Sequence, residues 1–240
     1  MTCIQQWWLA PQEIVTGDPL WGKVIMLLRN EPGVGFVDSG PLNLTVETVG
    51  TPVLNTAEGQ WGAGSLLTSA GNYLRAPDDV RMAFPANDGL TIEIAYWQPG
   101  PNVSGTMFHM DLGPAGTSAS LGLNIPTFDA IAFSGMGSGV IGAAGTAGSW
   151  HRLVMQWDAG GTGRGRVWHD GFRIWNVASG QLQPQYVAGG YIHIGCGLTG
   201  ASPWPGRLGE FRITAAARYD DTFNGAQWVM TLPTERMPGG

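Results

Sequence analysis

Four histidines are the residues of this chain with the widest range of possible chemistry. They are His109, His151, His169 and His193; no two of them have a His-x-x-x-His spacing, and each falls in an expected strand or at a turn. Structural or surface roles are therefore favoured over roles as metal ligands or general bases. The sequence also contains no Gly-x-Ser-x-Gly motif, which argues against the nucleophile elbow of serine hydrolases.

A glycosidase would need two carboxylates on opposite sides of the scissile bond, about 5–5.5 Å apart in a retaining enzyme. Within one strand such a pair must be two or four residues apart, because successive side chains point to opposite faces. No Asp or Glu pair has this spacing, and Glu93 and Glu210 are isolated acids in expected strands. We expect no enzymatic activity, although carboxylates from different strands could still form a pair.

A glycine-rich stretch at residues 137–142, GSGVIG, matches the Gly-x-Gly-x-x-Gly pattern of dinucleotide-binding turns. The pattern requires a helix directly after it, but AAGTAGSW follows, and its glycines would break that helix. A glycine-rich loop is the favoured interpretation.

The segment from Ser149 to Trp175 predicts the elements that would position these residues. Leu153, Met155 and Trp157 alternate with more polar residues, which indicates a strand. A glycine-rich turn at 158–163 and a second strand follow. Asp170-Gly171 then predicts a two-residue hairpin turn, because Gly adopts positive φ freely and Asp tolerates it.

Short runs of the same kind recur along the chain between Gly- and Pro-rich turns. Residues 90–97, LTIEIAYW, place Ile92, Ile94 and Tyr96 on one face, whereas Val24 to Leu28 is continuously apolar, as in a strand covered on both faces. Only Ala215 to Tyr219 suggests a helical turn. The other expected strands are 42–46, 60–67, 72–75, 107–110, 119–124, 130–133, 191–195 and 207–214. The prediction is an all-β chain folded as an antiparallel two-sheet jelly-roll sandwich.

The composition argues for a folded protein with few surface charges. Of 240 residues, 43% are hydrophobic and only 12% are charged, against about 25% in an average chain. Such a surface favours a homo-oligomer or a subunit of a larger assembly. With a net charge of −6 and no basic stripe, nucleic-acid binding is disfavoured. Arg164 and Arg166 are interpreted as a solvated strand end.

Cysteine content and the termini carry further expectations. Cys3 and Cys196 do not imply a disulfide framework. No secretory leader and no membrane-spanning segment are expected, since the first residues lack a basic region and no apolar run reaches roughly 18 residues. An N-terminal arm (1–17) bearing Trp7 and Trp8 is a candidate docking segment, followed by one domain (18–224) and a tail (225–240).

Nine blocks of the sequence follow one another in a familiar order. They are 18–28 (DPLWGKVIMLL), 61–67 (WGAGSLL), 71–77 (GNYLRAP), 90–97 (LTIEIAYW), 150–154 (WHRLV), 167–171 (VWHDG), 191–195 (YIHIG), 206–214 (GRLGEFRIT) and 217–223 (ARYDDTF). Together they resemble the laminin G-like branch of the concanavalin A-like lectin/glucanase domains, as found in bacteriophage tail and virion proteins. The resemblance covers roughly residues 18–224, most of the chain, but the family's glucanase signature, Glu-x-Asp-x-x-Glu, is absent.

The resemblance implies a non-enzymatic virion protein, either structural, decorating or tail-associated. Its partners would be other virion proteins and copies of itself, with adhesion to glycans as a further property. It would be assembled in the host cytoplasm and located in the virion. The alternatives are a dedicated carbohydrate-binding adhesin or receptor-binding protein, and a glycoside hydrolase of the glucanase type.

The candidate ligand sites follow from this resemblance and from the residue types. A sugar would stack on an aromatic ring and bind polar loop groups, for which Trp97, His109 and Trp204 are the candidates. Laminin G-like domains often bind calcium at the rim of the sandwich, which makes Asp111 and Asp129 the candidate calcium ligands. Most of the eleven Trp residues are expected in the core or in subunit contacts.

Overall fold

The computed structural model describes residues 18–60, 64–82, 88–101, 103–111, 120–125, 130–133, 139–142, 146–158, 164–177 and 189–231. Within these ranges the chain is all-β, and the predicted fold class is confirmed. The elements are η1 (Trp21–Lys23), β1 (Val24–Glu31), β2 (Gly35–Asp38), β3 (Glu47–Val49), β4 (Val53–Asn55), β5 (Ser65–Leu67), β6 (Tyr73–Pro77), η3 (Val80–Met82), β7 (Leu90–Gln98), β8 (Gly105–Asp111), β9 (Ser120–Ile125), β10 (Ala130–Phe133), β11 (Gly139–Gly142), β12 (Ser149–Trp157), β13 (Gly165–His169), β14 (Phe172–Val177), β15 (Tyr191–Ile194), η4 (Leu198–Gly200), β16 (Arg207–Thr214), β17 (Thr222–Phe223) and β18 (Trp228–Val229).

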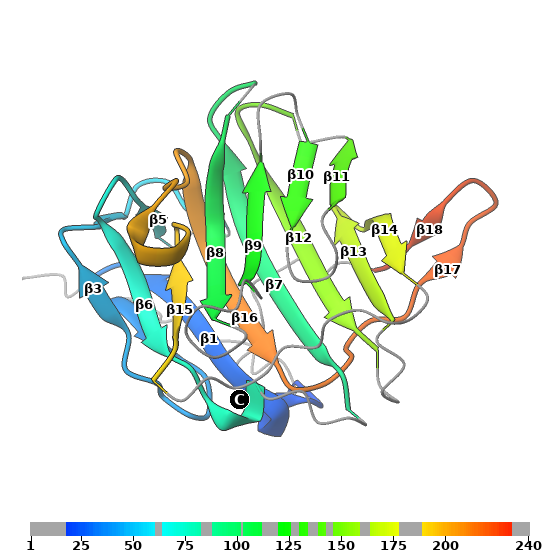
Figure 1. Ribbon diagram of the computed structural model, residues 1–240, viewed down its shortest axis with the longest axis horizontal. Coiled ribbons are helices and arrows are strands. Elements are labelled where there is room, and N and C mark those ends of the chain that lie inside the picture. Colours follow the sequence, from blue (N-terminus) through cyan, green and yellow to red (C-terminus); the bar gives the residue numbers. More distant parts are fainter. Residues whose placement is uncertain are drawn as a thin grey trace, which may run out of the picture.

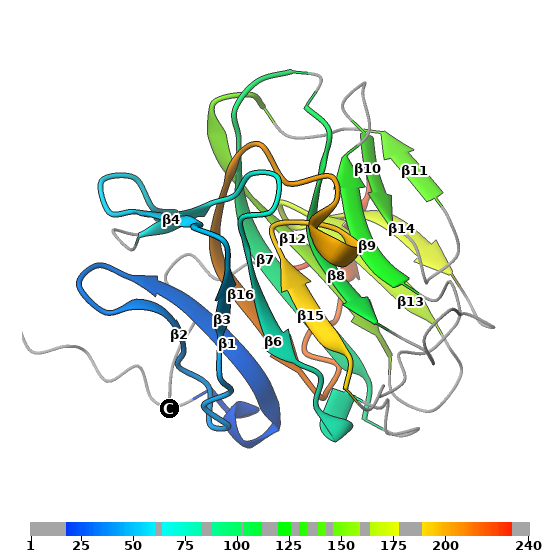
Figure 2. The same cartoon turned by 60° about the vertical axis from the view of Figure 1, so that its left-hand side comes forward.

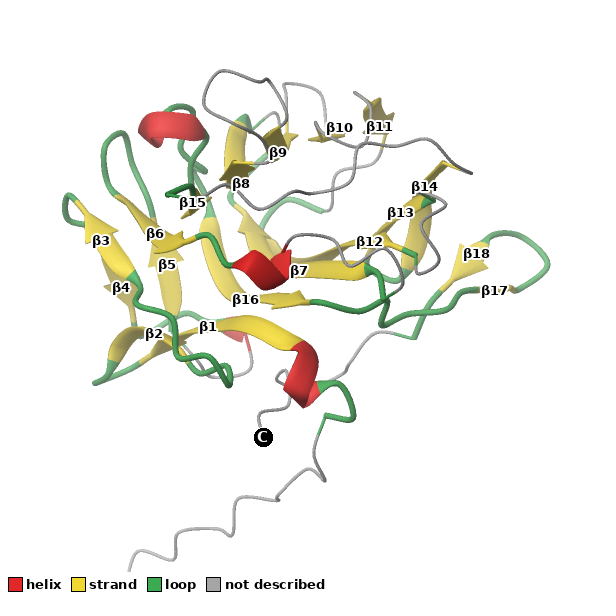
Figure 3. Ribbon diagram, turned by 60° about the horizontal axis from the view of Figure 1, so that its bottom comes forward, coloured by secondary structure: helices red, strands yellow, loops and turns green. Residues whose placement is uncertain are grey.

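Two antiparallel sheets lie face to face as the layers of a sandwich (Figure 1). The eleven-stranded sheet has the order β17-β18-β14-β13-β12-β7-β16-β1-β2, and β4 and β5 join it through β16. The seven-stranded sheet has the order β11-β10-β9-β8-β15-β6-β3. Figure 3 shows the two layers edge-on, with the β17–β18 hairpin projecting at one end. Figure 2 shows β2 and β4 at the opposite end.

Strands β7 and β12 form the centre of the eleven-stranded sheet. They pair without interruption from Ser149 opposite Gln98 to Trp157 opposite Leu90. Alternation in both strands places Ile92, Ile94, Leu153 and Met155 on one face, whereas Val154 packs on the other. After β13 the chain reverses at Asp170 and Gly171, with φ of 48° and 85°, which confirms the predicted turn.

The core lies between the sheets. Ile92, Ile94, Leu153 and Met155 of the larger sheet are essentially inaccessible, as are the inward residues of β8 and β15. The rings of Phe108 and Phe211, from opposite sheets, have centroids 5.4 Å apart. A leucine-sized side chain buried here contributes about 1.5–3 kcal/mol.

Part of the outer face of the eleven-stranded sheet is also buried, because residues 215–221 cross it. This segment bends at residues 215–216 and continues without regular secondary structure, so the predicted helical turn at 215–219 is wrong. Its backbone groups bind the sheet instead of each other: the Thr91 hydroxyl donates to the Ala216 carbonyl at 2.7 Å, and the Ala217 amide donates to the Asp88 carbonyl at 2.8 Å. These contacts replace the hydrogen bonds that a helical turn would have made.

A further local prediction differs from the structure. Residues 42–46 are not a strand, because the Asp38 carboxylate accepts the amides of Leu27, Gly40 and Leu44 and holds a loop there. Within residues 225–240, strand β18 places Val229 opposite Phe172. The Val24 to Leu28 strand is buried as predicted. No helix in the described part of the chain is long and apolar enough to cross a membrane.

Candidate functional site

A row of polar side chains crosses the outer face of the seven-stranded sheet. Glu47 of β3 pairs in register with Arg75 of β6, Arg75 with His193 of β15, and His193 with His109 of β8. Residues opposite one another on neighbouring strands share a face, so four strands contribute one side chain each. We call these four residues the polar row. It offers a carboxylate, a guanidinium and two imidazoles along one line.

Two tyrosines flank the polar row. The Tyr73 and Tyr191 rings lie 5.6 Å and 6.3 Å from the His193 ring, and the Arg75 guanidinium stacks over Tyr191 at 4.3 Å. Alternation explains the arrangement, because Tyr73 and Arg75 are two apart in β6, and Tyr191 and His193 are two apart in β15. Aromatic faces and hydrogen-bonding groups are thereby interleaved on one surface.

The accessible end of the row lies toward β3 and β6. Arg75 donates to Glu47 at 2.7 Å, and both side chains are partly exposed. This hydrogen bond raises the pKa of Arg75, so the guanidinium keeps its charge at any physiological pH. His109, His193 and Tyr73 are buried, with Gly200 of η4 packed against the Tyr73 ring. A ligand would meet Glu47, Arg75 and Tyr191 first.

The other sheet carries a cluster of charges on its outer face, but this cluster is enclosed. The Arg212 guanidinium donates to Glu93 at 2.5 Å and to Asp18 at 3.3 Å, and Tyr219 donates its hydroxyl to Glu93 at 2.6 Å. Arg218 reaches the same Asp18 carboxylate at 2.9 Å. We call Asp18, Glu93, Arg152, Arg212, Arg218 and Tyr219 the enclosed cluster.

Electrostatics explain why these charges tolerate burial. Burial of Glu93 opposes its ionisation, but Arg212, Arg152 and Arg218 together hold its pKa below the ordinary range. Burial also raises the pKa of Tyr219, which therefore stays protonated and can donate to Glu93. Arg212 and Arg218 each contact both carboxylates, Asp18 and Glu93, so both buried acids are paired, as stable burial requires.

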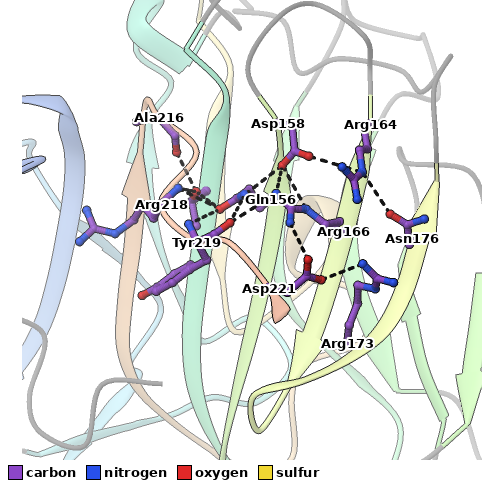
Figure 4. Close-up of polar contacts among 11 residues, drawn as sticks. Gln156, Asp158, Arg164, Arg166, Arg173, Asn176, Ala216, Arg218, Tyr219 and Asp221 are labelled. Carbon is purple, nitrogen blue, oxygen red and sulfur yellow. Dashed lines mark hydrogen bonds and ion pairs between the residues drawn. The ribbon is translucent and has the colours of Figure 1, made fainter. Parts of the chain in front are cut away.

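Gln156 anchors the covering segment next to this cluster (Figure 4). Its side-chain oxygen accepts the amides of Arg218 and Tyr219, both at 2.9 Å. Its side-chain nitrogen donates to the Tyr219 carbonyl at 2.8 Å and to Asp158 at 3.0 Å. All four bonding positions of this amide are used, so Gln156 is a structural latch.

A second group of ion pairs continues along the same face (Figure 4). Arg166 contacts Asp158 and, at 3.1 Å, Asp221, while Arg173 binds the other oxygen of Asp221 at 2.8 Å. Arg166 is buried, so the interpretation of Arg164 and Arg166 as a solvated strand end is wrong for Arg166. It fails because residues 219–221 fold back onto the strand.

These contacts bear on the glycosidase alternative. Glu93 has both oxygens engaged inside the enclosed cluster, and Glu210 is buried beside Arg29 at 3.5 Å. A general acid needs a raised pKa and access to substrate, and Glu93 has a lowered pKa and no exposure. In this structure Glu93 and Glu210 are therefore held in structural contacts.

The four histidines form two pairs, which the sequence spacing does not reveal. His109 and His193 meet across the seven-stranded sheet with ring centroids 5.9 Å apart. His151 and His169 meet on the inner face of the other sheet at 5.3 Å, next to Asp170. Alternation places each ring on a face, but only strand order brings the pairs together.

The three residues predicted to bind a glycan lie in different parts of the structure. His109 belongs to the polar row. Trp97 is half-buried on the opposite sheet, with the Arg207 guanidinium 4.2 Å above its ring. Trp204 is fully buried and packs edge-on against Tyr96 at 5.6 Å, so it offers no face to a sugar in this structure.

The remaining predicted site residues are not tested. Asp129, Trp7 and Trp8 lie outside the described residues, and Asp111 ends β8 without a described side chain. Calcium at the two aspartates and docking through the two tryptophans stay predictions. Cys196 carries a free, buried thiol whose pKa burial raises to about 12, so it is not a nucleophile.

The similarity of this chain to known proteins is a similarity of fold. No protein-family model and no curated protein sequence matches the chain. Among solved structures, botulinum neurotoxin type C, whose cell entry depends upon interaction with two ganglioside molecules, is similar at 12% identity and a TM-score of 0.59 over 83% of this chain. The binding domain of botulinum neurotoxin DC, solved with rat synaptotagmin II, is similar at 12% identity and a TM-score of 0.57 over the same share.

The chain spans about half the length of these toxin chains, 49% in each case. Domain 4 of AbnA, an extracellular arabinanase of Geobacillus stearothermophilus in complex with arabinotriose, is matched over 94% of its length and 87% of this chain, at 14% identity and a TM-score of 0.57. At these identities the similarity shows the fold, which is the two-sheet β-sandwich of these binding domains.

Proposed function

We propose that this chain is a non-enzymatic, lectin-like module that binds a glycan on the outer face of the seven-stranded sheet. The observation that carries the proposal is the polar row with its flanking tyrosines. Sugars present hydroxyl groups at the ring edge and apolar C–H groups on the ring face. Glu47 and Arg75 would bind the hydroxyl groups, and Tyr191 would stack on the apolar face.

Two of the similar structures support this choice of ligand class. One belongs to a toxin whose cell entry depends on gangliosides, and the other was solved with arabinotriose. The arabinotriose-bound domain is the more direct support, because it is matched over 94% of its length, whereas the toxin chain is matched over 49%. The location of the proposed site is inferred from this chain alone, because it depends on Glu47, Arg75 and Tyr191.

The test is a glycan array followed by titration of the strongest hits. The array includes arabinotriose and ganglioside-type sialylated oligosaccharides, with and without calcium, because Asp111 and Asp129 remain predicted calcium ligands. We expect Arg75→Ala and Tyr191→Ala each to weaken binding by at least about tenfold, since each removes a charged or stacking contact.

Arg207→Ala is the matched control. Like Arg75, Arg207 pairs with a glutamate, Glu58, and stacks on an aromatic ring, that of Trp97. Arg207→Ala should leave the affinity unchanged. Loss of binding in Arg207→Ala but not in Arg75→Ala would move the glycan site to Trp97, and an array without signal would overturn the proposal.

A second candidate function is assembly into a bacteriophage virion, supported by the sequence resemblance and by an exposed aromatic patch. Phe172, Phe223 and Trp228 are 46%, 56% and 40% exposed around the β17–β18 hairpin. Strand β17 ends the order of its sheet, so its outer edge can pair with the same edge of a second copy.

Light scattering on the purified chain tests this assembly. We expect an oligomer that dissociates in the Phe223→Ser/Trp228→Ser variant. A variant that lacks residues 1–16 distinguishes assembly through this patch from assembly through the N-terminal arm with Trp7 and Trp8. A monomer at all concentrations would contradict assembly through the hairpin, and release of reducing sugar from arabinan or laminarin would contradict the non-enzymatic assignment.

A further inference from the structure

His151 and His169 lie at one end of the sandwich, beside two residues with oxygen-containing side chains, Tyr96 and Asp170. Tyr96 of β7 pairs in register with His151 of β12, and His169 ends β13, directly before Asp170 at the turn. Tyr96, His151 and His169 have their rings close together, and the Asp170 carboxylate lies beside the two histidines at the turn. We call these four residues the histidine cluster.

One ring nitrogen of each histidine lies near the same carboxylate oxygen of Asp170. The Asp170 Oδ2 atom is 2.7 Å from Nδ1 of His151 and 3.8 Å from Nε2 of His169. The three ligand atoms all lie within 4.8 Å of one another. A tetrahedral ion with bonds of about 2.0–2.2 Å holds its ligand atoms roughly 3.3–3.6 Å apart, which lies between the two measured distances.

The atoms that would not touch an ion are held by the backbone. Nε2 of His151 donates to the Thr146 carbonyl at 2.9 Å, and Oδ1 of Asp170 accepts the Arg152 amide at 2.8 Å. A metal-binding histidine typically donates its second N–H to a carbonyl, which orients the ring. Nδ1 of His151 and Oδ2 of Asp170 are thus directed into the cluster.

His169 directs its Nε2 atom toward the other members of the cluster. Nε2 lies 2.8 Å from the Tyr96 hydroxyl oxygen and 3.8 Å from Oδ2 of Asp170. With the ring hydrogen on Nδ1, the Nε2 lone pair could bind a metal ion. Both histidines are buried, whereas the Asp170 side chain is 38% exposed and leaves a route from solvent.

The same residues also have the connectivity of a Ser-His-Asp triad, since the Ser149 hydroxyl is 3.0 Å from Nε2 of His151. That nitrogen, however, donates its hydrogen to Thr146, and the Ser149 hydroxyl contacts the same carbonyl. A general base needs a free lone pair at this position. The geometry does not activate Ser149 as a nucleophile.

We propose that His151, His169 and Asp170 form a binding site for one divalent transition-metal ion, with zinc as the best match. The ion would replace the hydrogen between Nδ1 of His151 and Oδ2 of Asp170, which would leave to solvent as a proton. A water molecule or the Tyr96 oxygen would complete four-coordination. Two imidazole nitrogens and one carboxylate oxygen form a donor set that binds zinc in preference to calcium.

The test uses the full chain without a polyhistidine tag, stripped of metal with a chelator. Titration with Zn²⁺ against a chromogenic chelator should give one site per chain. Co²⁺ should develop the visible absorption bands of tetrahedral coordination. Asp170→Asn and His169→Gln should each weaken Zn²⁺ binding by at least about tenfold.

Asp170→Asn keeps the turn, because Asn also tolerates the positive φ of this position. Its melting temperature without metal shows whether the variant folds. Asp79→Asn, at an aspartate paired with Arg81 on the surface, is the matched control and should not change Zn²⁺ affinity. Absence of stoichiometric binding, or equal affinity in Asp170→Asn, would show that the cluster is only a hydrogen-bonded structural group.

Discussion

The outer faces of the two sheets carry similar residue types but have different fates. On the eleven-stranded sheet, residues 215–221 cover Glu93 and Arg212, and the charges there neutralise one another. On the seven-stranded sheet, Glu47 and Arg75 form a comparable pair that stays partly open. A polar outer face is therefore structural where the chain covers itself and available to a ligand where it does not.

The largest difference should appear when an arginine is removed from each face. Arg212→Met leaves the Glu93 carboxylate buried without its nearest guanidinium, and it should lower the free energy of unfolding by about 3–5 kcal/mol. Arg75→Met should have a much smaller effect on the free energy of unfolding, because solvent screens its pair. Urea unfolding measures both, and equal losses would contradict the comparison.

Removal of the latch should have the next largest effect. Gln156→Leu leaves the amides of Arg218 and Tyr219 without their acceptor, at a cost of about 2–3 kcal/mol. Faster hydrogen exchange at these two amides would locate the loss in the covering segment. Gln227→Leu, at an exposed position, is the control and should unfold as the unaltered chain does.

Acid should weaken the covered face specifically. Because the pKa of Glu93 is lowered in the folded state, its stabilising contribution is fully present above the ordinary value of 4.5 and is lost as the pH falls through the folded-state pKa. Glu93→Gln should therefore flatten the decline in stability below that pH. Thermal unfolding across an acid pH series measures the slope, and an unchanged slope would contradict this assignment.

The smallest effect on stability should come from the open face. Glu47→Gln removes the charge that pairs with Arg75 and should change the free energy of unfolding by less than about 0.5–1 kcal/mol. Glycan affinity should nevertheless change, because the Arg75 guanidinium loses its positioning partner. Paired measurements of unfolding and binding separate the two roles; loss of stability without a change in affinity would count against a binding face.

Local alternation made much of the fold predictable from sequence. Strands 90–98 and 149–157 and the turn at Asp170 and Gly171 follow from side-chain period and from residues that tolerate positive φ. The buried first strand followed from its continuous apolar run. The helical turn at 215–219 was wrong, because its backbone partners, Asp88 and Gln156, come from distant segments.

The candidate sites depended on strand order, which local patterns do not determine. Sequence placed His109, Tyr191 and Arg75 in or beside strands, but only the sheet pairs His193 with both Arg75 and His109. The two histidine pairs could not be seen in the spacing for the same reason. Alternation determines which face of a strand a residue occupies, whereas long-range pairing and the covering segment decide its neighbours and its access to solvent.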